Sequence, residues 1–112
     1  MPPFSPGDIV RVPFPYTDRA VREHRPALVV SRPVGDGEAL VWVLMITSAD
    51  NRRWKGDIAL ISDYAECGLP APSLIRTSKI MTIEVREAER RGAIQQQRLA
   101  EVRAAMVAYL DW

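Results

Sequence analysis

The stretch from residue 39 to residue 48, ALVWVLMITS, constrains the fold more than any other part of the chain. Its first eight residues are all apolar, and it is rich in β-branched side chains, so it has no polar face to turn toward water. Short apolar runs of this kind are typical of strands that are buried on both faces. The stretch therefore predicts a central strand, with other strands on either side.

The rest of the chain carries the patterns of further short strands. Residues 7–14 alternate, with Val10, Val12 and Phe14 on one side and Arg11 on the other, which indicates a half-buried strand. Apolar or alternating runs predict three more strands, at residues 26–31, 57–62 and 74–84. In the last of these runs, neither side is wholly apolar, so one face of that strand is expected to contact solvent.

Turn and helix signals separate and follow these strands. Residues 15–24 and 49–56 are polar and charged and predict loops; a loop of about ten residues is more often functional than idle. Asp36-Gly37 marks a hairpin turn. Residues 63–68 predict a helical turn closed by Gly68. Pro70 and Pro72 exclude regular structure just after that turn. From about residue 95 the apolar period becomes helical, with a stripe formed by Leu99, Val102, Met106, Tyr109 and Leu110.

Five or more short strands followed by one helix in a chain of 112 residues predict a mainly β fold, a small bent sheet or barrel with a C-terminal α-helix. The length suits a single domain over residues 1–112.

Composition excludes several classes of protein. The single cysteine, Cys67, rules out a disulfide framework and a multi-cysteine zinc site, which fits a reducing cytoplasm. No apolar run is long enough to span a membrane, and the N-terminal residues lack the pattern of a signal peptide. The net charge is only +1, yet basic residues cluster locally, so the chain can still bind an anionic polymer. The basic clusters are Arg19, Arg22, His24 and Arg25; Arg52, Arg53 and Lys55; and Arg76 and Lys79.

The residue types favour chemistry that needs no metal or cofactor. One histidine and no carboxylates at ligand spacing make a zinc or two-metal centre a poor fit. The chain also lacks a glycine-rich phosphate loop and a nucleophile-elbow pattern.

Arg25 is the most informative single residue, because Pro26 follows it. Proline restricts the preceding residue to extended geometry, so the Arg25 side chain leaves the strand entrance in a defined direction. A guanidinium held in this way can bind a phosphate through two hydrogen bonds, or it can simply shield a strand edge as a solvated charge. His24 can carry a proton near neutral pH, but consecutive extended residues point to opposite faces.

Hydroxyl and aromatic groups near the strand ends are further candidates. Thr47 and Ser48 end the central apolar run, where their hydroxyls can donate to a phosphate or merely reflect strand preferences. Trp54 lies among three cations, Arg52, Arg53 and Lys55, in a composition suited to single-stranded nucleic acid. The alternative is a solvated loop whose tryptophan folds back on the core. Trp42 is expected in the core, and Trp112 as an anchor or a partner contact.

The order of these features resembles the MazF/PemK family of toxin–antitoxin toxins. The likeness covers nearly the whole chain and rests on five segments in the family's order: GDIVRVPFPYTD, HRPALVVS, MITS, GLPAPSLIRTSKIMTIE and RLAEVRAAMVAYLD. The resemblance implies an SH3-like barrel of the CcdB/PemK type, usually a homodimer. It also implies sequence-selective, metal-independent cleavage of single-stranded RNA and a cognate antitoxin.

Carried over residue by residue, the resemblance implies three catalytic groups: Arg25 acts on the reacting phosphate, Thr47 holds a phosphate oxygen, and Arg76 is a third phosphate or acid–base group. The expected RNA-binding residues are His24, Ser48, Arg52, Arg53, Trp54, Lys55 and Lys79. Some relatives carry an acid where this chain has Ser78, and many carry a base where it has Met81, so no general base is assigned. A non-catalytic barrel that inhibits DNA gyrase and an inactive RNA-binding module are the alternatives.

Overall fold

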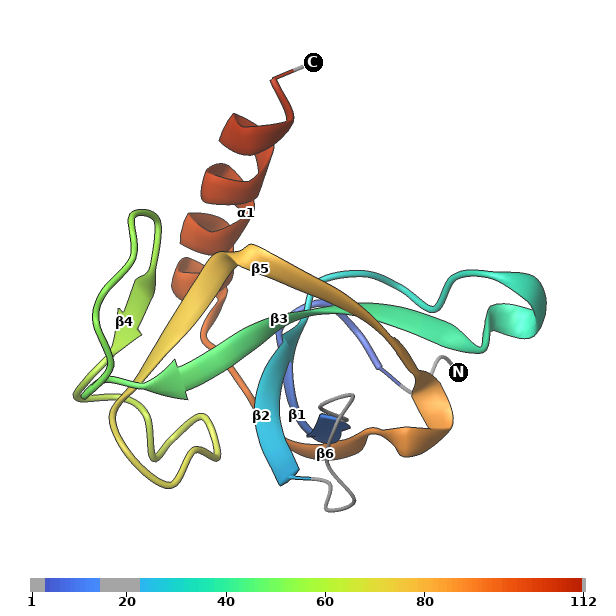
Figure 1. Cartoon of the computed structure of the whole chain (residues 1–112), viewed down its shortest axis with the longest axis horizontal. Coiled ribbons are helices and arrows are strands. Elements are labelled where there is room, and N and C mark those ends of the chain that lie inside the picture. The colour runs from blue at the N-terminus through green and yellow to red at the C-terminus, as the bar shows by residue number, and fades with distance from the viewer. Residues whose placement is uncertain (1–3, 15–22, 112) are drawn as a thin grey trace.

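Strand β3 (Leu40–Ser48) lies inside a six-stranded antiparallel sheet, as the apolar run predicts (Figure 1). The computed structural model describes residues 4–14 and 23–111 of the chain. The strands follow one another in space as β4-β5-β3-β2-β1-β6. The other elements are β1 (Asp8–Phe14), β2 (Glu23–Val29), β4 (Ile58–Leu60), β5 (Ser73–Glu84), β6 (Glu89–Ala93), the short 3-10 helices η1 (Asp36–Glu38) and η2 (Val85–Glu87), and the helix α1 (Gln96–Leu110).

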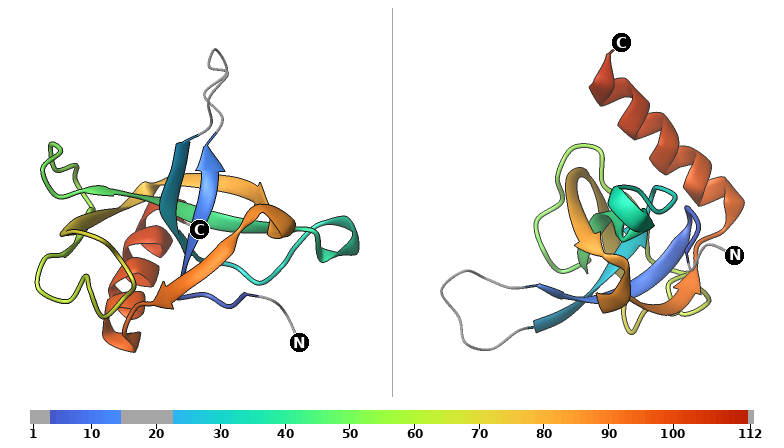
Figure 2. Two further views of the ribbon diagram at one scale, coloured as in Figure 1. Left: turned by 90° about the horizontal axis from the view of Figure 1, so that it is seen from below. Right: turned by 90° about the vertical axis from the view of Figure 1, so that its right-hand side faces the viewer.

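The sheet curls into a half-barrel, which gives it two separate cores (Figures 1 and 2). One core is rich in valine and includes Val10, Val12, Val29, Val41 and Val43. The other core includes Ile9, Leu28, Leu44, Ile46, Ile75 and Val102. Alternate residues of a strand face opposite sides, so β3 supplies both cores, which explains its continuous apolar sequence.

Helix α1 begins and ends close to the predicted limits, but its last turn is less packed than the rest. Leu99, Val102 and Met106 pack on the core that contains Ile75, and Val102 is almost fully buried. Burying one such side chain contributes about 1.5–3 kcal/mol. The C-terminal end projects beyond the sheet, so Tyr109 and Leu110 are 47% and 55% exposed (Figures 1 and 2). None of the described helices is long and apolar enough to cross a membrane.

Strand β6 was not predicted, because its sequence, ERRGA, is mostly charged. Tertiary contacts make it a strand: it pairs with the free edge of β1, and Gly92 lies against Gly68 of the 61–72 loop. A Cβ on Gly68 would overlap the carbonyl of Arg91, and a Cβ on Gly92 would overlap the carbonyl of Cys67. The two glycines therefore allow the backbones of the loop and of β6 to touch.

The remaining differences from the sequence-based predictions are local. β2 begins at Glu23, earlier than expected, because pairing with β1 continues to Phe14 and draws His24 into the ladder. Trp42 was predicted to be in the core, and this was wrong: it is 45% exposed, since α1 packs against β4 and β5 instead of over Trp42. The side chain of Phe14, most of the 15–24 loop with Arg19 and Arg22, and Trp112 lie outside the described residues.

Candidate functional site

Arg25 and Thr47 come together because of the register between β2 and β3. Ala27 pairs with Met45 in an antiparallel ladder, so continuing that register by two residues sets Arg25 opposite Thr47 on the same face. Both residues line a hollow of about 180 Å³, which we call the central hollow. Its other lining residues are Met45, Trp54, Arg76 and Lys79.

Arg25 is held at the rim of the central hollow by an ion pair on its own strand. Its Nη2 lies 2.9 Å from Oε2 of Glu23, and its Nε lies 3.3 Å from the same oxygen. Both side chains are substantially exposed, and exposed ion pairs contribute only about 0–1 kcal/mol. A phosphate that binds Arg25 through two hydrogen bonds can therefore replace this contact.

Thr47 has its hydroxyl oriented by Asn51, which the sequence analysis did not single out. Asn51 Nδ2 donates to Thr47 Oγ1 at 2.6 Å, so the hydroxyl proton of Thr47 is left to donate elsewhere. Asn51 reaches this position because its backbone N–H closes a turn onto the carbonyl of Ser48. A turn that brings an asparagine back to a strand end leaves no specific sequence pattern, so only the fold reveals this contact.

Arg76 and Lys79 reach the central hollow through an irregularity in β5. Leu44 pairs with Ile80 and Ile46 with Ile75, so Met45 alone faces residues 76–79 of β5. Extra residues on one strand bend it and redirect its side chains. The predicted alternation along β5 therefore breaks at this point, and the strand changes from buried before Ser78 to largely exposed after it.

The Arg76 guanidinium is buried and has three neighbours. Its Nη2 donates to the carbonyl of Arg52 at 2.9 Å, and its Nη1 lies 3.5 Å from Oδ2 of Asp57. Its Cζ lies 3.9 Å from the centre of the Trp54 ring, a stacked cation–π arrangement. Asp57 Oδ2 also accepts from the Trp54 backbone N–H at 2.8 Å. Asp57 and Arg76 together hold the 49–57 loop against β5.

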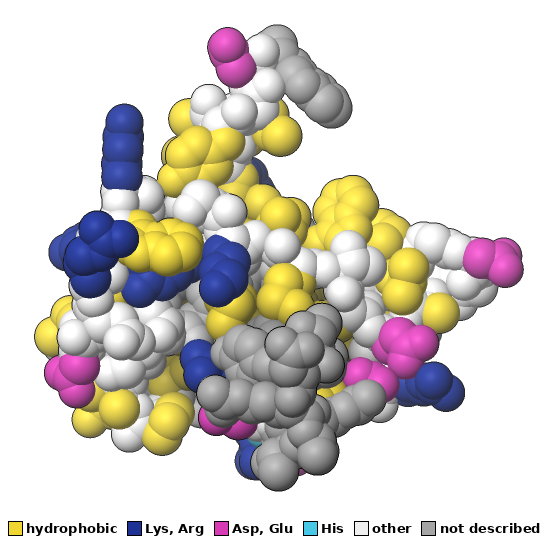
Figure 3. Space-filling model, viewed as in Figure 1, with side chains coloured by type: hydrophobic (Ala, Val, Ile, Leu, Met, Phe, Trp, Pro, Cys, Tyr) yellow, Lys and Arg dark blue, Asp and Glu magenta, His cyan; other side chains and the backbone are white. Residues whose placement is uncertain are grey.

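Trp54 presents the rest of its ring at the edge of the central hollow. The residue is 37% exposed although Arg76 covers part of it, and Lys79 Nζ lies 5.9 Å from the ring centre. Figure 3 shows Lys and Arg side chains gathered around this region of the surface. The loop places an aromatic ring beside three cations that line the same hollow, Arg25, Arg76 and Lys79.

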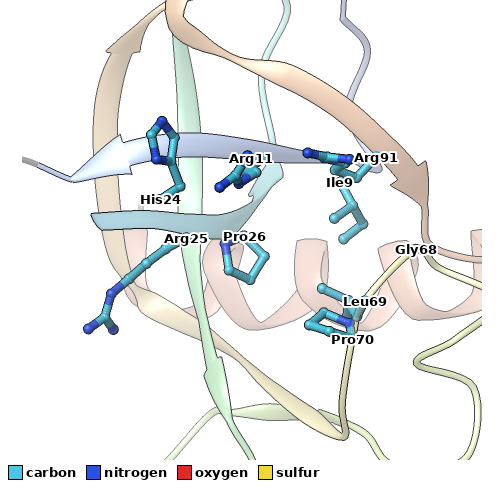
Figure 4. Close-up of a pocket in the computed structure, with 9 residues that line it drawn as sticks. All are labelled: Ile9, Arg11, His24, Arg25, Pro26, Gly68, Leu69, Pro70 and Arg91. Atoms are coloured by element: carbon cyan, nitrogen blue, oxygen red, sulfur yellow. The ribbon is translucent and has the colours of Figure 1, made fainter. Parts of the chain in front are cut away.

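The other candidate residues lie elsewhere. Ser48 lines an adjoining hollow together with Arg25 and Thr47. Arg53 turns toward Asp57 and Arg98 on another side of the loop, and neither Arg52 nor Lys55 lines the central hollow. His24 points to the opposite side of β2 from Arg25, as alternation predicts (Figure 4).

The link between α1 and the site is a hydrogen-bonded cluster. Thr77 Oγ1 donates to the carbonyl of Gly56 at 2.7 Å and lies 3.0 Å from the hydroxyl of Tyr109. The exposed end of α1 is thus attached to the loop that carries Trp54.

Among the described residues, no three His, Cys, Asp or Glu side chains gather as a metal site requires.

The fold and the site define a small curled-sheet protein that presents a cationic, hydroxyl-bearing and aromatic hollow at its strand ends, a combination suited to a phosphate with an adjacent ring. Residues 5–110 match the family model of the PemK-like, MazF-like toxins of type II toxin–antitoxin systems, so the chain belongs to this family.

Solved structures of family members share the fold. A MazF chain from a MazE–MazF complex of Deinococcus radiodurans superposes with a TM-score of 0.74 at 22% identity, covering 95% of this chain and 94% of that one. The toxin MazF-mt6 of Mycobacterium tuberculosis gives a TM-score of 0.67 at 22% identity, covering 96% and 97%. An endoribonuclease solved with its cognate antitoxin from a mycobacterial species gives 0.69 at 17% identity, covering 95% and 93%. A search of curated protein sequences gave no significant match.

Proposed function

We propose that the chain is an endoribonuclease toxin that cleaves single-stranded RNA at selected sequences without a metal ion. The observation that carries the proposal is that Arg25 and Thr47 line one hollow with Trp54 and Lys79. Family membership and the endoribonuclease among the structural relatives support the same reaction. RNA as substrate implies action in the cytoplasm.

In the proposed reaction, the ribose 2′-oxygen bonds to the adjacent phosphorus while its proton passes to water. The bond from phosphorus to the 5′-oxygen of the next nucleotide breaks, and that oxygen takes a proton from water, which leaves a 2′,3′-cyclic phosphate and a 5′-hydroxyl end. Arg25 binds two non-bridging oxygens and stabilises the charge that grows on them, and Thr47 donates its hydroxyl proton to a phosphate oxygen. Positioning and positive charge then supply most of the rate.

The neighbours of these two residues have supporting roles in the proposal. Trp54 stacks on an unpaired base, an interaction worth about 1–3 kcal/mol. Lys79 and Arg76 add positive potential, and Arg76 is better suited to this role and to holding Trp54 than to acid–base catalysis, because a guanidinium does not lose its proton in proteins.

The test is cleavage of RNA by the purified protein, with cut sites mapped by primer extension. Arg25→Ala and Thr47→Val are expected to lower kcat/KM by at least about 100-fold, the usual effect of removing one preorganised donor. Arg86→Ala is the matched control, because Arg86 is highly exposed and pairs only with Glu84 among the described residues. Full activity of Arg25→Ala, or loss of cleavage in excess chelator, would contradict the mechanism. RNA binding without any cut would select the inactive RNA-binding module instead.

We also infer a homodimer and an antitoxin partner. Large apolar side chains are exposed on β3 and β5, namely Trp42 and Ile80, and on α1, namely Val107, Tyr109 and Leu110. Figure 3 shows hydrophobic side chains over α1 and continuing across the sheet. Exposed apolar patches of this kind are typical of protein interfaces. Light scattering of the purified protein, alone and with the product of any small acidic reading frame beside its gene, measures both associations. A monomer that binds no such product would contradict the inference.

A further inference from the structure

A second hollow, on the other side of Arg25, is not used by the reaction described above. It measures about 360 Å³ and lies between the β2–β1–β6 part of the sheet and residues 68–70 of the loop (Figure 4). We call it the lateral groove. It shares Arg25 with the central hollow, and Pro26 and Pro70 with the hollow that holds Thr47 and Ser48.

The lateral groove has one cationic side and one apolar side. Figure 4 shows His24, Arg11 and Arg91, from β2, β1 and β6, in a row above the apolar side chains of Ile9, Leu69 and Pro70. Arg11 pairs with Pro26 of β2 and with Glu89 of β6, so His24 and Arg91 are offset from it along their strands and the row runs diagonally across the sheet.

The charges of this row are available to a ligand. Arg11 is exposed, and no ion pair joins it to another residue in the described part of the chain. Arg91 Nη2 pairs with Glu89 Oε1 at 3.4 Å, and both side chains are largely exposed, so the contact is weak. Even with Glu89 counted, two guanidinium groups leave the row with net positive charge.

We propose that the lateral groove binds the nucleotides that continue from the scissile phosphate, with Arg11 and Arg91 on backbone phosphates and the apolar side under sugar and base. This inference rests on the proposed function. An RNA strand whose phosphate binds at Arg25 must lead away from that residue. Arg25 lines three of the described hollows, and the lateral groove is the one of them that Thr47 does not line.

An acidic segment of a protein partner is the competing occupant. RNA is favoured because the groove shares Arg25 with the site for the reacting phosphate and because cationic and apolar groups line opposite sides. A single strand likewise carries its phosphates along one edge and its bases along the other.

The experiment combines protein variants with shortened substrates. Once the cut site is mapped, RNA oligonucleotides that contain it are trimmed one nucleotide at a time from each end. Arg11→Gln and Arg91→Gln are compared with Arg86→Gln, which removes the same charge from a residue that does not line the groove. For the longest RNA, we expect KM to rise about tenfold in each groove variant with kcat unchanged, because the lost contact is made equally in the ground and transition states. For the shortest RNA that is still cut, the groove variants should equal the control.

Salt dependence gives a second measure. Binding of an RNA with 2′-deoxyribose at the cut site can be followed by fluorescence anisotropy without cleavage. Each groove variant should reduce the slope of log K against log salt by about 0.7, the value for one phosphate contact on a single strand.

The outcomes separate the two proposals. If the unmodified protein cuts no RNA, the proposed function fails. If it cuts RNA and both groove variants match Arg86→Gln at every length, the lateral groove does not bind substrate. Unchanged cleavage together with weakened antitoxin binding would also overturn the inference and assign the groove to the antitoxin.

Discussion

The buried pair of Asp57 and Arg76 gives the sharpest test of how this site is held together. The side chain of Asp57 is 0% exposed and that of Arg76 is 8% exposed. Asp57→Asn keeps the shape of the side chain but leaves the guanidinium buried without its counter-charge. Removing one partner of a buried ion pair costs about 3–5 kcal/mol.

The structure places the expected cost at the lower end of this range. Arg76 would keep its hydrogen bond to the carbonyl of Arg52 and its stacking on Trp54. We therefore expect Asp57→Asn to lower the free energy of unfolding by about 3 kcal/mol, which corresponds to about 12 °C in Tm for a domain of this size.

Urea unfolding followed by tryptophan fluorescence measures this change. Glu84→Gln is the control, because its pair with Arg86 is exposed and should be worth about 0–1 kcal/mol. Adding Arg76→Met to Asp57→Asn should restore part of the lost stability by removing the unpaired charge. A loss below about 1 kcal/mol for Asp57→Asn, or no coupling between the two positions, would refute the reasoning.

Three further changes test other contacts. Gly56→Ala should destabilise the fold by about 1–2 kcal/mol in urea unfolding, because Gly56 has a φ of +87°, which is unfavourable for a residue with a Cβ, and the new methyl group would displace the Tyr109 hydroxyl; a neutral result would contradict this strain. Asn51→Ala should lower kcat about tenfold by releasing the Thr47 hydroxyl, with little change in RNA affinity; equal kcat would exclude an orienting role. Burial, with the nearby carboxylates of Asp63 and Glu66, raises the pKa of the Cys67 thiol above its ordinary value. The unfolded chain therefore loses this proton first, and stability should fall as pH rises past the ordinary pKa of a thiol, by less in Cys67→Ala; identical pH profiles would contradict this.

Local patterns predicted most of the fold, because they report which faces of each element are buried. The β3 run, the alternation of Val10 and Val12 and the part of the helical stripe from Leu99 to Met106 reflect burial that the structure confirms. The last two residues of the stripe, Tyr109 and Leu110, are exposed instead. β6 could not be predicted in this way, since its pairing with β1 and the Gly68–Gly92 contact depend on distant segments.

The site was only partly predictable, for the same reason. Pro26 next to Arg25 is a local signal, and so is a hydroxyl at the end of β3. The irregularity that turns Arg76 and Lys79 toward one hollow appears only when β5 is aligned with β3. The role of Asp57 likewise depends on the fold, because nothing in its sequence neighbourhood indicates that it is buried.

The contact between Gly68 and Gly92 also fixes a dimension of the molecule. Gly68 is followed directly by Leu69 and Pro70, and Gly92 directly follows Arg91, so the two glycines join the apolar and cationic sides of the lateral groove. The distance between those sides is set by two positions that carry no side chain. A single added methyl group at either position would force the loop and β6 apart and widen the lateral groove. The width of the groove therefore depends on the smallest residues in the chain.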